Sequence, residues 1–231
     1  MERWSIIDKA FIIPSIEIYL YDLRIMYALK KSYDRIDGEY YARSRLFGWW
    51  HKNRFRRAYD IIDISEKGFI IVDVGCNGGN FTESLLDFGD VVGLDVSRSF
   101  IQASKRRVKG ASFVLTDVQY LPLREGVCDL VTCLEVLEHL PNPDRVIRGS
   151  WRILRNDGRL FISTPDDGKV LWRFIWFFWQ NIGRGTAWKH KHIYKFNREK
   201  LVGSIYPYFT DVTVDYVNFF MLIMLICRKR D

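Results

Sequence analysis

The sequence has little of the residues that mark disulfide-rich, proline-rich or membrane-spanning proteins. Among its 231 residues are only 4 cysteines and 6 prolines, which excludes a disulfide scaffold and leaves little room for a proline-rich linker. No two cysteines have CxxC spacing and no histidine stands at zinc-ligand spacing from them, so we expect no metal site and a reducing, cytoplasmic location. No stretch reaches the roughly 18 uncharged apolar residues of a membrane-spanning helix, and residues 1–20 are too charged for a signal peptide.

The composition is that of a globular protein with an excess of positive charge. Apolar residues make up 48% and charged residues 27% of the chain, the net charge is +7 and the pI is about 9.2. The excess favours an anionic partner, which is a phosphate-bearing ligand, a nucleic acid or an acidic membrane surface. A solvated basic surface accounts for the charge equally well, and we expect one for the basic cluster at residues 52–57.

The order of apolar runs along the chain predicts an α/β fold. Residues 1–35 have the charge spacing of amphipathic helices broken at Pro14, and residues 49–66 predict another helix. From Gly68 onward strands alternate with helices. The expected strands cover residues 68–75, 91–96, 111–118, 128–137, 158–165, 209–217 and 218–229. This pattern predicts a doubly wound, seven-stranded, mostly parallel sheet with an antiparallel edge strand, which binds its ligand at the carboxyl ends of the strands.

Polar residues gather where four of these strands end. The first strand leads into a loop at residues 75–79, where glycine allows a sharp turn and the close approach of a ligand. Asp95, Asp117 and Glu135 follow the second, third and fourth strands. Each feature alone is typical of an ordinary tight turn or a surface acid, so only the combination predicts a binding site.

The combination resembles the class I S-adenosylmethionine-dependent methyltransferases, and among them the small-molecule branch that includes the ubiquinone-biosynthesis enzymes. The resemblance is carried by IVDVGCNGG, VVGLDVS, LTDVQYLPL, CDLVTCLEVLEHL and LRNDGRLFISTP. It is strong over residues 68–165 and weaker over residues 188–228. It implies a Rossmann-like fold, S-adenosylmethionine as the cofactor and S-adenosylhomocysteine as the product.

The resemblance also implies a role for each matching residue of the first loop. Asp73 and the backbone of Gly75, Cys76, Asn77 and Gly79 would hold the methionine end of the cofactor. Asn77 stands where the family usually has glycine, but asparagine tolerates a left-handed backbone, so we expect the loop to form. A dehydrogenase is the rival for such a loop. The acid before the first glycine, however, suits a cationic amino group better than a pyrophosphate.

The next two strands carry the implied contacts to the nucleoside. Asp95 would hold the ribose hydroxyls, and Val96 would pack on the adenine. Asp117 would meet the exocyclic amine of the adenine, with Val118 beside it. The LTDVQYLPL segment has a role only if the ligand is adenosylmethionine, which further disfavours a dehydrogenase.

The fourth strand and three histidines carry the implied chemistry. Leu134 and Glu135 would border the sulfonium. Methyl transfer needs the acceptor in line with the sulfonium, and it needs a general base only for an unactivated hydroxyl or a similar group. The candidates for this base are Glu138 and, among the histidines, His139, His190 and His192. A structural role for the EHL segment and a solvated basic loop are the respective alternatives.

Acceptor specificity is expected outside the motif core. We expect an N-terminal helical cap at residues 1–60 and a methyltransferase domain at residues 61–231, with an aromatic-rich insertion at residues 166–196 after the fifth strand. Within the insertion, residues 171–179 are almost wholly apolar. Such a helix is buried in the core, covers a hydrophobic acceptor as a lid, or enters a membrane interface as a wedge. The Lys and Arg residues around it favour a lid or a wedge.

The sequence therefore predicts an enzyme that transfers a methyl group from S-adenosylmethionine to a small or lipid-like acceptor with an apolar part. We expect it in the cytoplasm, with peripheral contact to an anionic membrane. A nucleic-acid methyltransferase acting on RNA and a non-catalytic S-adenosylmethionine-binding protein are the alternatives. No Asn-Pro-Pro-Tyr-like motif follows the fourth strand, which counts against methylation of exocyclic base amines.

Overall fold

The computed structural model describes residues 45–62, 68–179, 181 and 192–230. The helices expected within residues 1–35 and the candidate base His190 lie outside the described residues. The helix expected near residue 49 is present as α3 (Arg45–Ile62). Because α3 runs across residue 60, it links the two expected regions, and their division into a cap and a domain stays a prediction.

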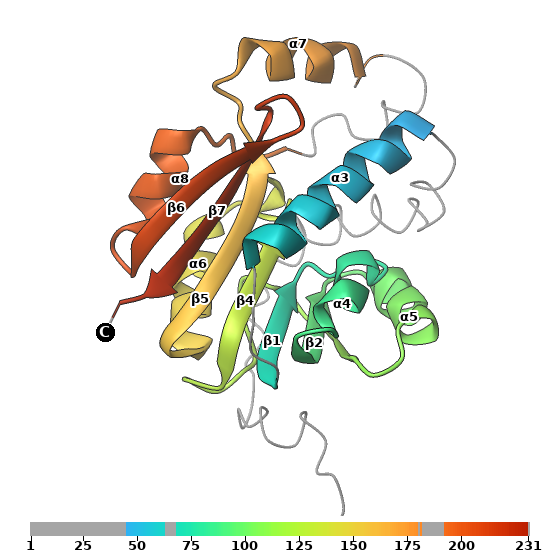
Figure 1. Cartoon of the computed structure of the whole chain (residues 1–231), viewed down its shortest axis with the longest axis vertical. Helices are drawn as coiled ribbons and strands as arrows, with labels where there is room; N and C mark the ends of the chain where they lie inside the picture. The colour runs from blue at the N-terminus through green and yellow to red at the C-terminus, as the bar shows by residue number, and fades with distance from the viewer. Residues whose placement is uncertain (1–44, 63–67, 180, 182–191, 231) are drawn as a thin grey trace, which may run out of the picture.

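Seven strands form one sheet, as the sequence predicts (Figure 1). They are β1 (Phe69–Val74), β2 (Gly89–Asp95), β3 (Ser112–Leu115), β4 (Cys128–Leu134), β5 (Leu154–Pro165), β6 (Phe209–Val217) and β7 (Leu222–Lys229). Their order is β3-β2-β1-β4-β5-β7-β6, and β1 to β5 pair in parallel. β7 runs antiparallel between β5 and β6. The expected doubly wound sheet with antiparallel pairing toward one edge is confirmed.

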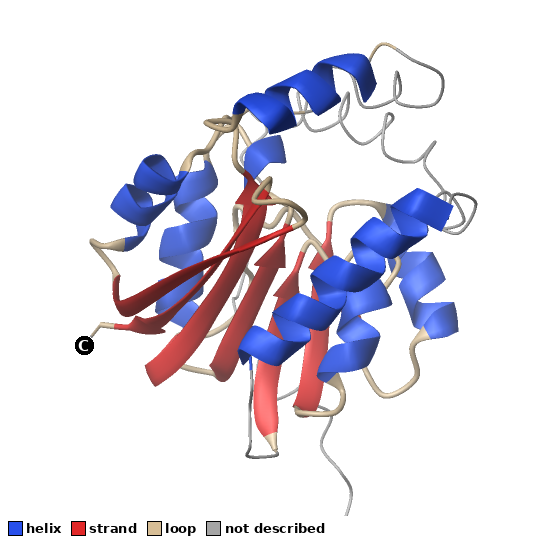
Figure 2. Cartoon of the chain, turned by 45° about the horizontal axis from the view of Figure 1, so that its top comes forward, coloured by secondary structure: helices blue, strands red, loops and turns tan. Residues whose placement is uncertain are grey.

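Helices cover both faces of the sheet (Figure 2). Besides α3, they are α4 (Asn80–Leu85), α5 (Arg98–Arg107), the short 3-10 helix η2 (Leu137–His139), α6 (Pro143–Ile153), α7 (Val170–Trp179) and α8 (Arg198–Ile205). On one face α3 and α4 bury Ile62 and Phe81 against the strands. On the other face α6 and α8 bury Ile147 and Leu201 in a larger cluster. Among the described residues, no helix is both long enough and apolar enough to cross a membrane.

Four strand boundaries differ from the expected ones by three or more residues. One is the end of β4, at Leu134 instead of residue 137, because η2 begins at residue 137. β3 ends at Leu115, because its only neighbour β2 ends directly opposite that residue. β5 begins at Leu154 rather than at residue 158, since α6 already ends at Ile153. The last strand begins at Leu222, because residues 218–221 form a turn. These changes leave Asp73, Asp95 and Glu135 at the carboxyl ends of β1, β2 and β4, which lie at one edge of the sheet.

Candidate active site

The loop after β1 approaches the segment after β4 so closely that no side chain fits at Gly75. Gly75 has a φ of 73°, and a Cβ atom there would lie 2.2 Å from Cγ2 of Val136. Asn77 adopts the expected left-handed backbone, with a φ of 49°. Cys76 is buried, and its carbonyl oxygen accepts a hydrogen bond from the N–H of Gly79 at 2.9 Å. The small and left-handed residues are therefore required by the space and the path of this loop.

Asp73 lies beneath this loop, between β4 and α4. Its side chain is 2% exposed. One carboxylate oxygen accepts from the Thr82 hydroxyl at 2.6 Å and the other accepts from the Thr132 hydroxyl at 2.9 Å. Burial raises the pKa of this carboxyl, and the two hydroxyl donors act in the opposite direction. Asp73 thus links α4 to β4 through two hydrogen bonds. Its contact with the methionine amino group stays a prediction.

Asp95 joins the end of β2 to the same loop. Its carboxylate accepts from the N–H of Asn77 at 2.9 Å and from the N–H of Ser97 at 2.8 Å. Burial raises the pKa of Asp95 to about 6, although these backbone donors lower it. Each oxygen keeps a lone pair for a further donor such as a ribose hydroxyl. The structure therefore brings two of the predicted cofactor residues, Asp95 and Asn77, into direct contact.

The turn after β3 holds a buried acceptor that the sequence did not reveal. Asp117 accepts from the N–H of Gln119 at 3.0 Å. Gln119 is 5% exposed, and its side-chain oxygen has no hydrogen-bond partner among the described residues. Val118 is buried and Val96 is half-buried. A polar residue in a loop gives no sequence signal of burial, so Gln119 could be found only from the fold.

An ion pair that the sequence did not predict lies at the end of β4. Glu135 follows the half-buried Leu134 with a φ of 54°, and its carboxylate pairs with Arg54 of α3. Arg54 is only 7% exposed, so the expectation of a solvated surface for residues 52–57 is wrong at this position. Oε1 of Glu135 and Nε of Arg54 are buried, and neither has a hydrogen-bond partner within the described part of the chain.

Five aromatic rings, which we call the aromatic row, connect α3, α7 and η2 above this edge. Trp50 stacks on Trp172 with 6.4 Å between ring centroids, and Trp172 stacks on Trp176 at 5.3 Å. Trp176 stacks on His192 at 4.1 Å, and the ring of His192 meets that of His139 edge-on at 5.0 Å. Two of the three predicted histidines are therefore neighbours, although they are far apart in the sequence.

The two faces of α7 differ in their exposure to solvent. Trp172 on the inner face is 8% exposed, whereas Phe174 and Phe177 on the outer face are 61% and 60% exposed. Ile175 and Phe178 are also exposed. The exposed outer face agrees with the lid and the wedge, whereas the alternative of burial under residues 1–35 concerns a segment outside the described residues and is not tested.

Burial strongly affects the ionisable groups around His139. It raises the pKa of the Glu138 carboxyl well above its usual range, and Thr164 donates a hydrogen bond to that carboxyl at 3.1 Å. Burial also lowers the pKa of His192 to about 3, with smaller effects from His139 and Lys195. Ligand atoms of Glu138, His139 and His192 lie within 4.8 Å of one another, which is a composition that could hold a metal ion. The expected absence of a metal was argued from cysteine spacing alone, and it stays a prediction.

Comparison with known proteins bears on this geometry. A family described as "Methyltransferase domain" matches residues 72–162. These residues form a class I S-adenosylmethionine-dependent methyltransferase domain. The chain is similar to the ubiquinone biosynthesis O-methyltransferases of Coxiella burnetii (32% identity over 131 residues) and Dechloromonas aromatica (36% over 132 residues). Each match covers 50% of this chain and 56% or 57% of the relative, so the chain spans little more than half the length of these relatives.

Solved structures of methyltransferases share the fold of this domain. One is a putative methyltransferase from Haloferax volcanii in complex with the Trm112 methyltransferase activator, with a TM-score of 0.71 and 15% identity over 87% of this chain and 97% of the other. Another is a possible histamine N-methyltransferase from Thermotoga maritima, with a TM-score of 0.67 and 15% identity over 87% of this chain and all of the other. At these identities the likeness concerns the fold alone.

The cofactor of this domain class is S-adenosylmethionine, and the residues present fit it. The ammonium group of the methionine end and the exocyclic amine of the adenine both donate hydrogen bonds. Glu135 and Gln119 each offer a buried oxygen that lacks a donor in the described residues. Gly75 leaves room that a single Cβ atom would remove. The assignment of individual residues to parts of the cofactor stays a prediction.

Proposed function

We propose that the protein transfers a methyl group from S-adenosylmethionine to a small or lipid-like acceptor that has an apolar, planar part. The aromatic row is the observation that carries this proposal, because Trp176 stacks on His192, whose ring meets that of His139 in η2, the helix that follows β4. Flat rings stack on flat rings with a favourable offset geometry, and they exclude water from the space between them. The names of the Coxiella and Dechloromonas relatives, which are O-methyltransferases of ubiquinone biosynthesis, agree with such an acceptor.

The cofactor supplies a methyl group on a sulfonium, which is an excellent leaving group. The task of the chain is then to hold and orient the two reactants. The loop at residues 75–79 and Asp95 hold the cofactor, while Leu134 and Glu135 border the methyl group. Trp176 stacks on the acceptor and keeps water out. His139 takes the proton of a hydroxyl acceptor. Its ring meets that of His192, on which Trp176 stacks. His190 stays a candidate for the same role.

The acceptor is tested by incubating the protein with labelled S-adenosylmethionine and extracts that contain quinones, phenols and lipids. We expect label in the apolar fraction. Trp176→Ala should lower this incorporation at least several-fold and leave the affinity for S-adenosylhomocysteine unchanged, because the cofactor loops lie elsewhere. Tyr206→Ala is the matched control, since it removes an exposed ring that belongs neither to α7 nor to the aromatic row. Equal incorporation by Trp176→Ala and the wild type would refute the assigned role of the aromatic row.

The same purified protein also allows two alternative functions to be tested. A methyltransferase acting on RNA is favoured by the net charge of +7, and its affinity for the nucleic acid would fall steeply with added salt. A non-catalytic protein would bind S-adenosylhomocysteine but incorporate no label into any extract. For the proposed enzyme, peripheral contact with an anionic membrane would bring an apolar acceptor to the site.

A further inference from the structure

The turn between β6 and β7 holds two exposed phenylalanines in a strained backbone. Asn218, Phe219 and Phe220 have φ values of 54°, 59° and 62°. The left-handed region suits asparagine but is unfavourable for bulky residues. Phe219 and Phe220 are nevertheless there, and they are 69% and 68% exposed. Strain of this kind persists only where the surroundings impose it, and it is concentrated at functional sites.

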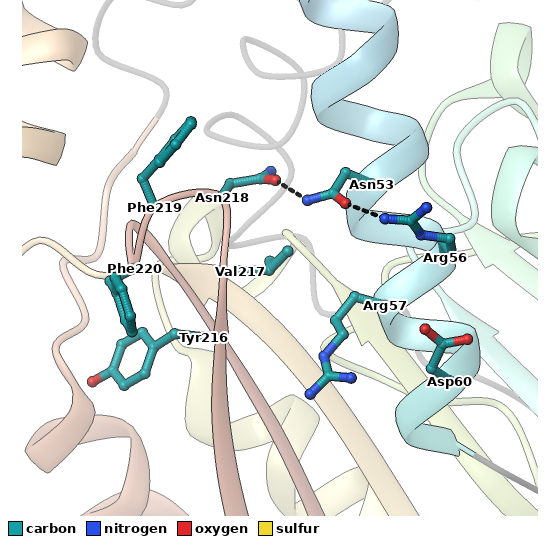
Figure 3. Close-up of a pocket in the computed structure, with 9 residues that line it drawn as sticks. All are labelled: Asn53, Arg56, Arg57, Asp60, Tyr216, Val217, Asn218, Phe219 and Phe220. Carbon is teal, nitrogen blue, oxygen red and sulfur yellow. Dashed lines mark hydrogen bonds between the residues drawn. The ribbon is translucent and has the colours of Figure 1, made fainter.

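The surroundings fix the turn at both of its ends. Asn218 is 4% exposed, and its side chain accepts from the amide of Asn53 at 2.8 Å and donates to the carbonyl oxygen of Trp50 at 3.3 Å. The carbonyl oxygen of Met221 accepts from the N–H of Asp166 at 2.9 Å. Figure 3 shows Asn218 pointing toward Asn53 of α3, whereas Phe220 points toward the ring of Tyr216. The turn is therefore tied to α3 and to the end of β5, and its two rings project outward.

Exposed aromatic groups of three elements meet at this end of the molecule. The ring of Phe219 lies 6.1 Å from that of Trp49, which is 46% exposed, and the ring of Phe220 lies 5.9 Å from that of Tyr216. Lys169, the residue before α7, places its ammonium group 5.1 Å from the centroid of the Tyr216 ring. In both views α7 and the turn lie at the same end of the sheet (Figures 1 and 2).

Basic residues accompany this apolar surface. A cavity of about 490 Å³ between α3 and the turn is lined by both phenylalanines and by Arg56, Arg57 and Asp60. Arg56 donates to the side-chain oxygen of Asn53 at 3.0 Å, and Arg57 pairs with Asp215. Lys169, directly before α7, and Arg173, which is exposed on α7, add further positive charge. Projecting apolar rings fringed by cations complement the interface of an anionic lipid bilayer.

We propose that the β6–β7 turn inserts Phe219 and Phe220 into the interface of an anionic bilayer, next to the outer face of α7. The two anchors together orient the molecule with the carboxyl edge of its sheet toward the lipid, so that an apolar acceptor reaches the aromatic row without crossing water. This orientation rests on the proposed function for its purpose, but lipid binding by the turn is measured independently of methyl transfer. The surface fits lipid better than RNA, because the exposed rings are phenyl groups on two separate projections rather than a groove.

The test is co-sedimentation of the whole protein with vesicles of phosphatidylcholine containing one-third phosphatidylglycerol. The double variant Phe219→Asn, Phe220→Asn removes both rings, and asparagine is well suited to the left-handed backbone, so the fold should be kept or slightly stabilised. Vesicle affinity should fall on the order of tenfold for each ring lost. Tyr206→Asn is the control, since it removes a 54% exposed ring that lies just before β6, at the opposite end of that strand from the turn. Its vesicle affinity should equal that of the wild type.

A second measurement locates the insertion at the turn. All four native cysteines are buried, so a Phe220→Cys variant carries one accessible thiol for a polarity-sensitive dye. We expect a blue shift of its emission with the anionic vesicles and none with single-stranded poly-uridine. Wild-type affinity in the double variant, or a dye that responds to poly-uridine instead of vesicles, would overturn the proposal. If the double variant loses vesicle binding but still binds S-adenosylhomocysteine, the loss lies at the turn. If the wild type binds vesicles but methylates no apolar acceptor, the proposed function fails and lipid binding by the turn stands.

Discussion

Protonation of Asp95 should control cofactor affinity between pH 5 and 7.5. Burial raises the pKa of this carboxyl to about 6 in the free protein. Ribose hydroxyls that donate to the carboxylate stabilise its ionised form, so cofactor binding requires the loss of a proton at acidic pH. At pH 5 only about one-tenth of the molecules hold an ionised Asp95. The dissociation constant of S-adenosylhomocysteine should therefore rise roughly tenfold from pH 7.5 to pH 5.

The variant Asp95→Ala separates this carboxyl from other titrating groups. It should bind S-adenosylhomocysteine about 1.5–3 kcal/mol more weakly at pH 7.5, which is the range for hydrogen bonds to a charged group. Its affinity should no longer depend on pH in this window if Asp95 is the only group involved. Asp167 also has a pKa raised to about 6, mainly by burial, so any remaining pH dependence would point to that residue.

Calorimetric titration at several pH values is the assay, and the fold of the variant is checked by thermal unfolding. The melting temperature should fall, because the N–H groups of Asn77 and Ser97 lose their acceptor. Asp90→Ala is the control, since Asp90 is exposed near the opposite end of β2. A folded Asp95→Ala protein with wild-type affinity at pH 7.5, or a wild-type affinity that does not change with pH, would remove Asp95 from the cofactor site.

Three further outcomes are expected. S-adenosylhomocysteine at 100 times its dissociation constant should stabilise the protein by about 2.7 kcal/mol in thermal unfolding, and NAD should have no effect. Gly75→Ala should lose cofactor binding or fail to fold, because its Cβ atom would meet a valine methyl group at 2.2 Å, whereas Gly203→Ala has open space and should be neutral or stabilising in urea unfolding. Arg54→Met should cost about 1–3 kcal/mol of unfolding free energy by leaving the half-buried Glu135 without its cation, while Lys52→Met, at an exposed position, should change stability little.

The sheet and the strand-end acids could be predicted from the sequence because their signals are local. Apolar runs bounded by glycine identify strands, and the parallel arrangement then brings Asp95 and the loop at residues 75–79 to one edge. Asn77 could be assigned a left-handed backbone from its residue type alone. These features depend on neighbours within a few positions, so a single sequence contains most of the information that specifies them.

The rest of the site depends on contacts between distant segments. Arg54 has the same charge and the same local spacing as its exposed neighbours, and only the position of α3 over β4 buries it. The stacking of Trp176 on His192 joins α7 to a residue beyond the segment that follows it. The insertion could be recognised as unusual, but the direction in which each of its rings faces is decided by tertiary packing.

Within two turns, helix α3 contacts the β6–β7 turn, the aromatic row, the end of β4 and α4. Trp50 contacts both the β6–β7 turn and the aromatic row, Asn53 bonds the turn, Arg54 pairs with the end of β4, and Phe55 stacks on α4 behind the cofactor loop. A shift of this one helix would therefore change both the β6–β7 turn and the end of β4 at the candidate active site. Coupling between two binding events is reciprocal. If membrane binding raises the affinity for the cofactor through α3 by some factor, cofactor binding must raise the affinity for the membrane by the same factor. An enzyme built this way would hold its methyl donor most tightly at the place where its acceptor is dissolved.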